Sequence, residues 1–248
     1  MERVLELITD VRARYPRDQF FDYFEPSCAA HRLKRMYYAE YGRAFMTLDS
    51  DAWNSLKLKA LNHYLDHRPG QLKQGFFNQL NEAFAYRFLK KRGLTQIRFV
   101  PESGQRTPGL AFVKDRQTCH CEVKTLCISQ EVILRRSTSK VFDGSTYQTL
   151  NTNFFTKLSS DIDDASSQLS SQSGKGLAYI FVIPDDFTLE HYATYRRQLT
   201  NFVQRHSASD LYLKVGILGQ RAVSKGTIAR SNSVPNNSFK PKPLRGSA

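Results

Sequence analysis

The sequence feature that most constrains the fold is an uninterrupted apolar run, GLAYIFVI, at residues 176–183. The run is far too short to span a membrane, and it leaves no polar face for water, so we expect a strand that is covered on both sides. Apolar residues recur at helical spacing before it, at 154–169, and a second helix is expected after it, at 189–206. These patterns predict an α/β fold with helices on both faces of a sheet.

Other short strands surround this buried one. Residues 96–100, 110–114 and 118–126 are rich in β-branched and aromatic residues, and their short connections are typical of hairpins. A helix is predicted to begin at Phe76 and to stop at Gly93, and a last strand is predicted at 211–218. The expected order from residue 76 onward is therefore α-β-β-β-α-β-α-β.

The chain divides into three predicted parts. Residues 1–70 show helical periodicity up to Pro69 and Gly70, which predicts a helical N-terminal lobe. Residues 71–220 hold the alternating helices and strands of an α/β core. Residues 221–248 are rich in Ser, Asn and Pro and contain no Asp or Glu, which predicts a disordered basic tail.

The strand at 118–126 carries an unusual pair of charges. Side chains two residues apart share a face of a strand, so His120, Glu122 and Lys124 point one way while Cys119 and Cys121 point towards the core. A carboxylate and an ammonium are costly to desolvate on a partly buried sheet. Such a pair is usually salt-bridged on a solvated face or belongs to a functional site.

The surrounding order of motifs resembles the PD-(D/E)xK nuclease superfamily, which has the restriction-endonuclease-like fold. That family has a helix with an inward glutamate, a hairpin bearing Pro-Asp, and a strand bearing E-x-K. The matching residues are Glu82 in NQLNEAFAYRF, Pro108 and Gly109 in RTPGLAF, and Glu122 and Lys124 in CEVKTL. The resemblance spans about residues 76–185 and implies an αβββαβ core with a mixed sheet flanked by helices.

The resemblance also implies a chemistry. A family member would be a metal-dependent nuclease hydrolysing phosphodiester bonds, most often of DNA, in defence, repair or mobile-element biology. Glu122 and the backbone carbonyl of Val123 would bind Mg²⁺, with Mn²⁺ as an alternative. Lys124 would take the catalytic lysine role, and Glu82 would add an outer or second-metal carboxylate. Candidate nucleic-acid contacts are His120, Lys157 and Gln168.

One position departs from the family pattern. Gly109 stands where the family has its metal-binding aspartate, and glycine offers no side-chain oxygen. Glu102, at the end of the first predicted strand, would lie opposite Gly109 if the intervening residues form a turn, and Glu82 is the other replacement. The alternative hypothesis is a catalytically degenerate nuclease-fold protein that binds nucleic acid or a partner without cutting.

The charge of the chain agrees with a polyanionic partner. Thirty-six Lys and Arg against 23 Asp and Glu give a formal net charge of +13, which favours nucleic acid, with DNA as the first candidate. The sequence lacks a signal-peptide pattern and a membrane span, so we expect a cytoplasmic protein, associated with the nucleoid in a bacterial-type cell, and no membrane partner. Its four cysteines are expected to be reduced thiols, and a homodimer stays open.

Overall fold

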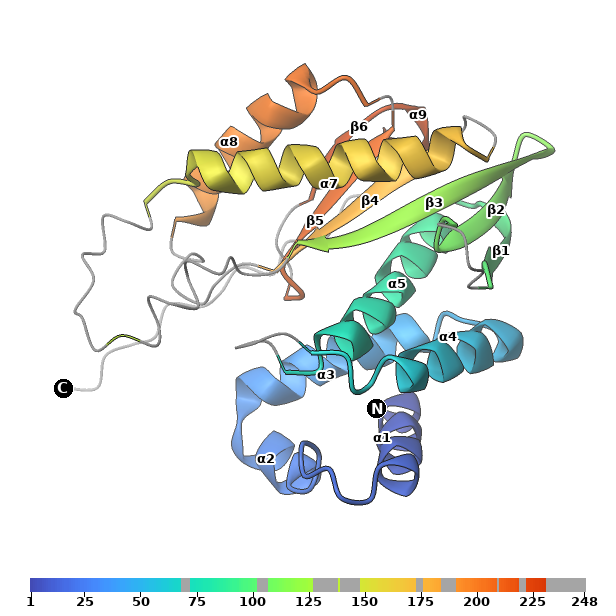
Figure 1. The fold of residues 1–248 in the computed structure, drawn as a ribbon, viewed down its shortest axis with the longest axis vertical. Helices are drawn as coiled ribbons and strands as arrows, with labels where there is room; N and C mark the ends of the chain where they lie inside the picture. The colour runs from blue at the N-terminus through green and yellow to red at the C-terminus, as the bar shows by residue number, and fades with distance from the viewer. Residues whose placement is uncertain are drawn as a thin grey trace.

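The computed structural model places one open, mixed sheet between two helical layers, as Figure 1 shows. It describes residues 1–67, 72–101, 107–126, 138, 148–172, 176–183, 191–208, 210–218 and 222–230. The predicted α/β class is confirmed, because helices cover both faces of the six-stranded sheet.

The strands follow one another across the sheet in chain order. The first three are antiparallel neighbours, the third, fourth and fifth are parallel, and the sixth runs antiparallel to the fifth. The last predicted strand, 211–218, ends early, because Gly216 adopts a left-handed φ of 63°. The strands are β1 (Thr95–Phe99), β2 (Leu110–Lys114), β3 (Gln117–Leu126), β4 (Gly176–Val182), β5 (Leu211–Val215) and β6 (Val223–Lys225).

The two faces of the sheet belong to two hydrophobic clusters. On one face, α7 (Thr152–Ser170) and α8 (Tyr192–Arg205) pack against Ile180 and its neighbours. On the other face, α5 (Gln74–Lys91) packs against Tyr179 and Phe181. Successive residues of β4 therefore point into different layers, and both layers are apolar, as the run at 176–183 predicts.

The N-terminal lobe is helical, as predicted. It consists of α1 (Glu2–Arg14), α2 (Phe24–Ala30), α3 (Arg32–Phe45) and α4 (Ser50–Asn62). Its core continues without interruption into the sheet. The ring of Tyr41 lies 5.0 Å from that of Phe84 on α5, and Phe84 lies 5.4 Å from Phe181 on β4. The lobe is thus a second layer beneath α5, as Figure 1 shows, and the predicted boundary at residue 70 lies outside the described residues.

The start of the predicted tail is ordered. Val223 on β6 and Ile228 and Ala229 on the short helix α9 (Thr227–Arg230) are buried. These apolar side chains extend the core past residue 221, where composition alone predicts disorder, while residues 231–248 lie outside the described residues. Among the helices that the structure describes, none is both long and apolar enough to cross a membrane. Cys28, Cys119 and Cys121 are buried cysteines that form no disulfide with one another, and Cys127 lies outside the described residues.

Capping side chains fix where two of the site-bearing helices begin. Asp49 accepts a hydrogen bond from the Ala52 amide at 2.8 Å and starts α4. Asn151 accepts one from the Phe154 amide at 2.9 Å and starts α7. Between them, α5 carries buried residues on most of its circumference, since it packs on the lobe below and on the sheet above.

Candidate functional site

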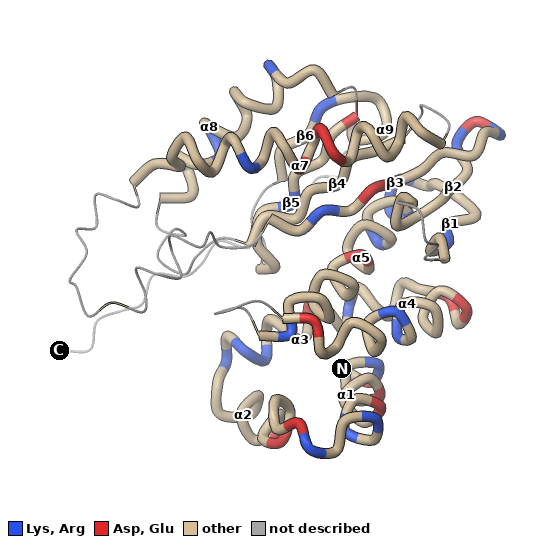
Figure 2. The backbone as a smooth tube through the Cα atoms, viewed as in Figure 1, with Lys and Arg blue, Asp and Glu red and all other residues tan. Residues whose placement is uncertain are grey.

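A polar pocket of about 370 Å³ lies against the edge of β3, along the part of that strand that has no pairing with β2. The first residue of β2, Leu110, pairs with Cys121, so residues 122–126 of β3 have a strand partner only in β4 among the described residues. Residues of α4, α5, β3 and α7 line the pocket, together with the segment that leads into β2. Figure 2 shows Lys or Arg positions on α4, β3 and α7, which border it.

Glu122 is the most constrained acid in the pocket. Its side chain is only 8% exposed, its Oε2 accepts the Gly109 amide at 3.1 Å, and its Oε1 lies 3.0 Å from the Lys124 ammonium. Burial raises the pKa of Glu122, while Lys124, the Gly109 N–H and the charge of Lys59 act in the opposite direction. The E-x-K pair therefore forms a buried ion pair at the pocket wall.

The backbone of Val123 also turns towards the pocket. The Leu126 carbonyl accepts the Ile183 amide, so at Leu126 the backbone polar groups of β3 point towards β4. Backbone groups alternate between the two edges of a strand, and the pairing of β3 with β4 is regular. The Val123 carbonyl, three residues earlier, must therefore point to the free edge, where Val123 lines the pocket.

Lys124 is held on its other side by α7. Its Nζ donates to the Gln168 side-chain oxygen at 2.7 Å, in addition to its contact with Glu122. Gln168 was predicted to contact nucleic acid, and the structure places it behind Lys124, where its oxygen orients the ammonium. This contact leaves Lys124 28% exposed, so the ammonium is tethered but reachable from the pocket.

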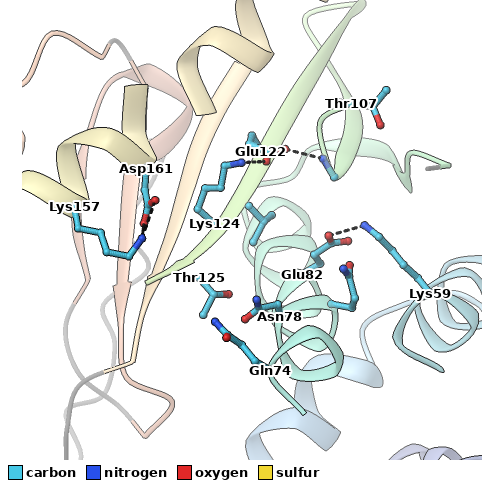
Figure 3. Close-up of a pocket in the computed structure, with 13 residues that line it drawn as sticks. Lys59, Gln74, Asn78, Glu82, Thr107, Glu122, Lys124, Thr125, Lys157 and Asp161 are labelled. Carbon is cyan, nitrogen blue, oxygen red and sulfur yellow. Dashed lines mark hydrogen bonds and ion pairs between the residues drawn. The ribbon is translucent and has the colours of Figure 1, made fainter. Parts of the chain in front are cut away.

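Glu82 reaches the same pocket from α5. Its side chain is 9% exposed, and its Oε1 accepts from the Lys59 ammonium on α4 at 2.7 Å. A Cβ added at Gly109 would lie 3.1 Å from this Oε1 and 3.3 Å from the carboxyl carbon. The Glu82 carboxylate therefore borders the space that a side chain at position 109 would enter. Figure 3 shows Glu82 and Lys59 joined by their ion pair.

Helix α7 supplies the opposite wall. Lys157, a predicted nucleic-acid contact, lies 3.3 Å from Asp161, and both line the pocket. Figure 3 shows this pair facing the pocket across from Lys59 and Glu82, with Glu122 and Lys124 between them. Three lysine–carboxylate pairs from three layers of the molecule thus surround one pocket.

Of the predicted site residues that the structure describes, His120 does not join this constellation. His120 lies one pleat before Glu122 but does not line the pocket, and burial and the charge of Arg98 lower its pKa. Glu102, the other replacement for the family aspartate, lies outside the described residues.

The donors in the pocket suit a hard divalent cation with few protein ligands. The part of the chain that the structure describes contains no group of three or more His, Cys, Asp or Glu side chains able to hold a metal. Mg²⁺ keeps several waters and is commonly bound through one or two carboxylates together with substrate phosphate. The two carboxylates, the Val123 carbonyl and the space at Gly109 fit that demand.

Several pocket residues escaped sequence reasoning. Lys59 belongs to an ordinary amphipathic pattern on α4 and meets Glu82 only through the packing of α4 on α5. Asp161 forms an i, i+4 pair with Lys157, an arrangement that is typical of a solvated helix face, and this face lines the pocket. Polar residues on the first half of α5 add amide groups to the lining. They are Gln74, Asn78 and Gln79.

Comparison of the chain with protein-family models, curated proteins and solved structures found no match. The assignment of a function therefore rests on the pocket and on the order of the elements around it.

Proposed function

We propose that the protein is a metal-dependent nuclease that hydrolyses phosphodiester bonds of nucleic acid, with DNA as the substrate. The observation that carries the proposal is the convergence of Glu82, Glu122 and Lys124 on one pocket at the free edge of β3. The order of helix, hairpin and E-x-K strand around that pocket supports a restriction-endonuclease-like arrangement.

In this proposal the protein holds a Mg²⁺ or Mn²⁺ ion through its own oxygen atoms. Glu82, Glu122 and the Val123 carbonyl are the ligands, and the ion, when bound, polarises the phosphate and lowers the pKa of a bound water. Glu82 takes the place of the family aspartate, because its carboxylate borders the empty space at Gly109. The Gly109 amide fixes one oxygen of Glu122 and leaves the other facing Lys124.

Lys124 then has two tasks near the reacting phosphate. Its ammonium orients the attacking water and offsets the negative charge that grows on the phosphate oxygens in the transition state. The tether to Gln168 keeps the ammonium at the pocket wall once an ion competes for Glu122. Lys157 on the opposite wall and the net charge of +13 supply attraction for the phosphate backbone.

A cleavage assay tests this proposal. Purified protein is incubated with supercoiled, linear and single-stranded DNA, and with RNA, in the presence of Mg²⁺, Mn²⁺ or EDTA. Glu122→Gln and Lys124→Met should each lower the cleavage rate by about a hundredfold or more, as expected when a metal ligand or a transition-state cation is lost. Glu25→Gln is the matched control, because Glu25 pairs with Arg12 in the lobe and lies outside the pocket lining. Equal cleavage by Glu122→Gln and wild type would refute the assignment.

A second candidate function is binding without cleavage. It is favoured by one observation: Glu82 and Glu122 are each paired with a lysine, and Gly109 contributes no ligand. A protein of this kind would bind DNA with a strong salt dependence, and the binding would survive Glu122→Gln. It would cut none of the substrates under any metal.

A further inference from the structure

Lys59 is a lobe residue that acts on the centre of the pocket. It lies on α4, its side chain is 14% exposed, and its ammonium is 2.7 Å from Glu82 Oε1. Its charge also acts on Glu122, where it opposes the effect of burial on the pKa. One ammonium from the lobe therefore stabilises both carboxylates that would hold a metal.

That position places Lys59 in competition with a cation. A divalent ion held by Glu82 and Glu122 would sit beside the ammonium, and like charges a few ångströms apart repel strongly in a half-buried site. Lys59 also occupies Glu82 Oε1, one of the oxygens that the ion needs. An ion that binds alone therefore meets the positive charge of the Lys59 ammonium beside the carboxylate that both would share.

A phosphodiester changes this balance. Its non-bridging oxygens carry negative charge, bind a lysine ammonium well, and also bind Mg²⁺ directly. The long, flexible stem of a lysine lets its ammonium turn from Glu82 to such an oxygen within the pocket that both residues line. Phosphate and metal together thus place a negative charge beside the Lys59 ammonium, which the metal alone does not.

We propose that Lys59 is a positioning residue that couples metal binding to the arrival of the nucleic-acid backbone, so that the pocket binds its ion weakly until a phosphate is present. The proposal rests on the proposed function of the same pocket. It makes the helical lobe part of the site, since α4 carries Lys59, whose contact with either Glu82 or a phosphate changes how strongly the metal ligands bind the ion.

Equilibrium Mn²⁺ binding to the intact protein tests the coupling without any turnover. Free Mn²⁺ is measured by electron paramagnetic resonance, with and without a phosphorothioate DNA duplex that resists cleavage. Lys59→Met should bind Mn²⁺ about tenfold more tightly than wild type when DNA is absent, because the competing charge is gone. The increase in Mn²⁺ affinity that DNA causes should be smaller in Lys59→Met than in wild type.

Two further variants isolate the cause. Lys59→Arg keeps the charge and should retain the weak binding and the tightening by DNA. Lys57→Met makes the same substitution two residues away, where Lys57 pairs with Glu6 and Asp10 on α1, and should leave Mn²⁺ binding unchanged. Circular dichroism confirms that each variant is folded.

The outcomes separate this inference from the proposed function. If Lys59→Met matches wild type while Glu122→Gln loses Mn²⁺ binding, the metal site stands and the coupling by Lys59 is refuted. The coupling is also refuted if Lys59→Arg binds as tightly as Lys59→Met. If Glu122→Gln binds Mn²⁺ as well as wild type with and without DNA, the metal site itself is wrong and both proposals fall.

Discussion

Placing an aspartate at position 109 should destabilise the metal-free protein. The backbone at Gly109 is not left-handed, so an aspartate is sterically allowed there, but its Cβ would lie 3.1 Å from Glu82 Oε1. Lys59 holds that oxygen in place, so Glu82 must shift by a few tenths of an ångström to make room. The new carboxylate would also lie beside Glu122, which contacts the Gly109 amide.

The magnitude follows from opposing effects on the free energy of unfolding. Replacing glycine reduces the conformational entropy of the unfolded chain, which stabilises the protein by about 0.4–1 kcal/mol. Two like charges about 4 Å apart repel by about 4 kcal/mol at an effective dielectric constant of 20, and Lys59 and Lys124 offset part of this. We expect Gly109→Asp to cost about 2–3 kcal/mol in the absence of metal. Gly109→Asn, with the same shape and no charge, should cost about 1 kcal/mol or less.

Urea unfolding followed by circular dichroism measures both variants. In EDTA, Gly109→Asp should unfold at lower urea than Gly109→Asn. Saturating Mg²⁺ should reverse that order, because an ion at a hundred times its Kd stabilises the folded state by about 2.7 kcal/mol. If both variants have equal stability in EDTA and neither responds to Mg²⁺, then Glu82 and Glu122 do not converge beside position 109.

Two further predictions concern buried polar groups. Burial raises the pKa of Glu122, so above that pKa the ionised carboxylate destabilises the metal-free fold. Glu122→Gln should therefore be more stable than wild type at neutral pH. Urea titrations at several pH values should show this difference in unfolding free energy shrink as pH falls and the folded wild type takes up a proton. A difference that grows on acidification would contradict the reasoning. Asn81 is fully buried, accepts the Tyr41 hydroxyl at 2.7 Å and donates to Thr125 at 3.1 Å. Asn81→Leu should cost about 2–3 kcal/mol in urea unfolding, and adding Tyr41→Phe should recover part of the loss, since the hydroxyl that bonded to Asn81 is removed as well.

Much of the sheet could be predicted because its signals are local. The apolar run at 176–183 required helices on both faces, and the alternation of residues 119–124 placed Glu122 and Lys124 on one side, where they form an ion pair at 3.0 Å. By contrast, β6 could not be predicted. It is three residues long, and only the burial of Val223 against neighbouring elements distinguishes it from a polar tail.

Some of the contacts between side chains in the pocket join residues of different helices and strands, and no local sequence pattern predicts which of these elements pack together. Lys59 and Glu82 are neighbours because α4 packs on α5, and no spacing within either helix signals the pair. Gln168 is predicted to contact nucleic acid, and its side-chain oxygen accepts a hydrogen bond from Lys124. The sequence shows that Gly109 offers no side-chain oxygen. Only the three-dimensional arrangement shows that the Glu82 carboxylate borders the space beside Gly109.

The continuous core from the lobe to the sheet limits how this protein can change. A module joined by a linker can be exchanged between proteins without harm to either half. Here a chain that began at residue 72 would expose the aromatic layer of α5, including Phe76 and Phe84, and would lose one wall of the pocket. Changes to the lobe's wall of the pocket would therefore have to arise by substitution within the lobe rather than by replacement of the lobe.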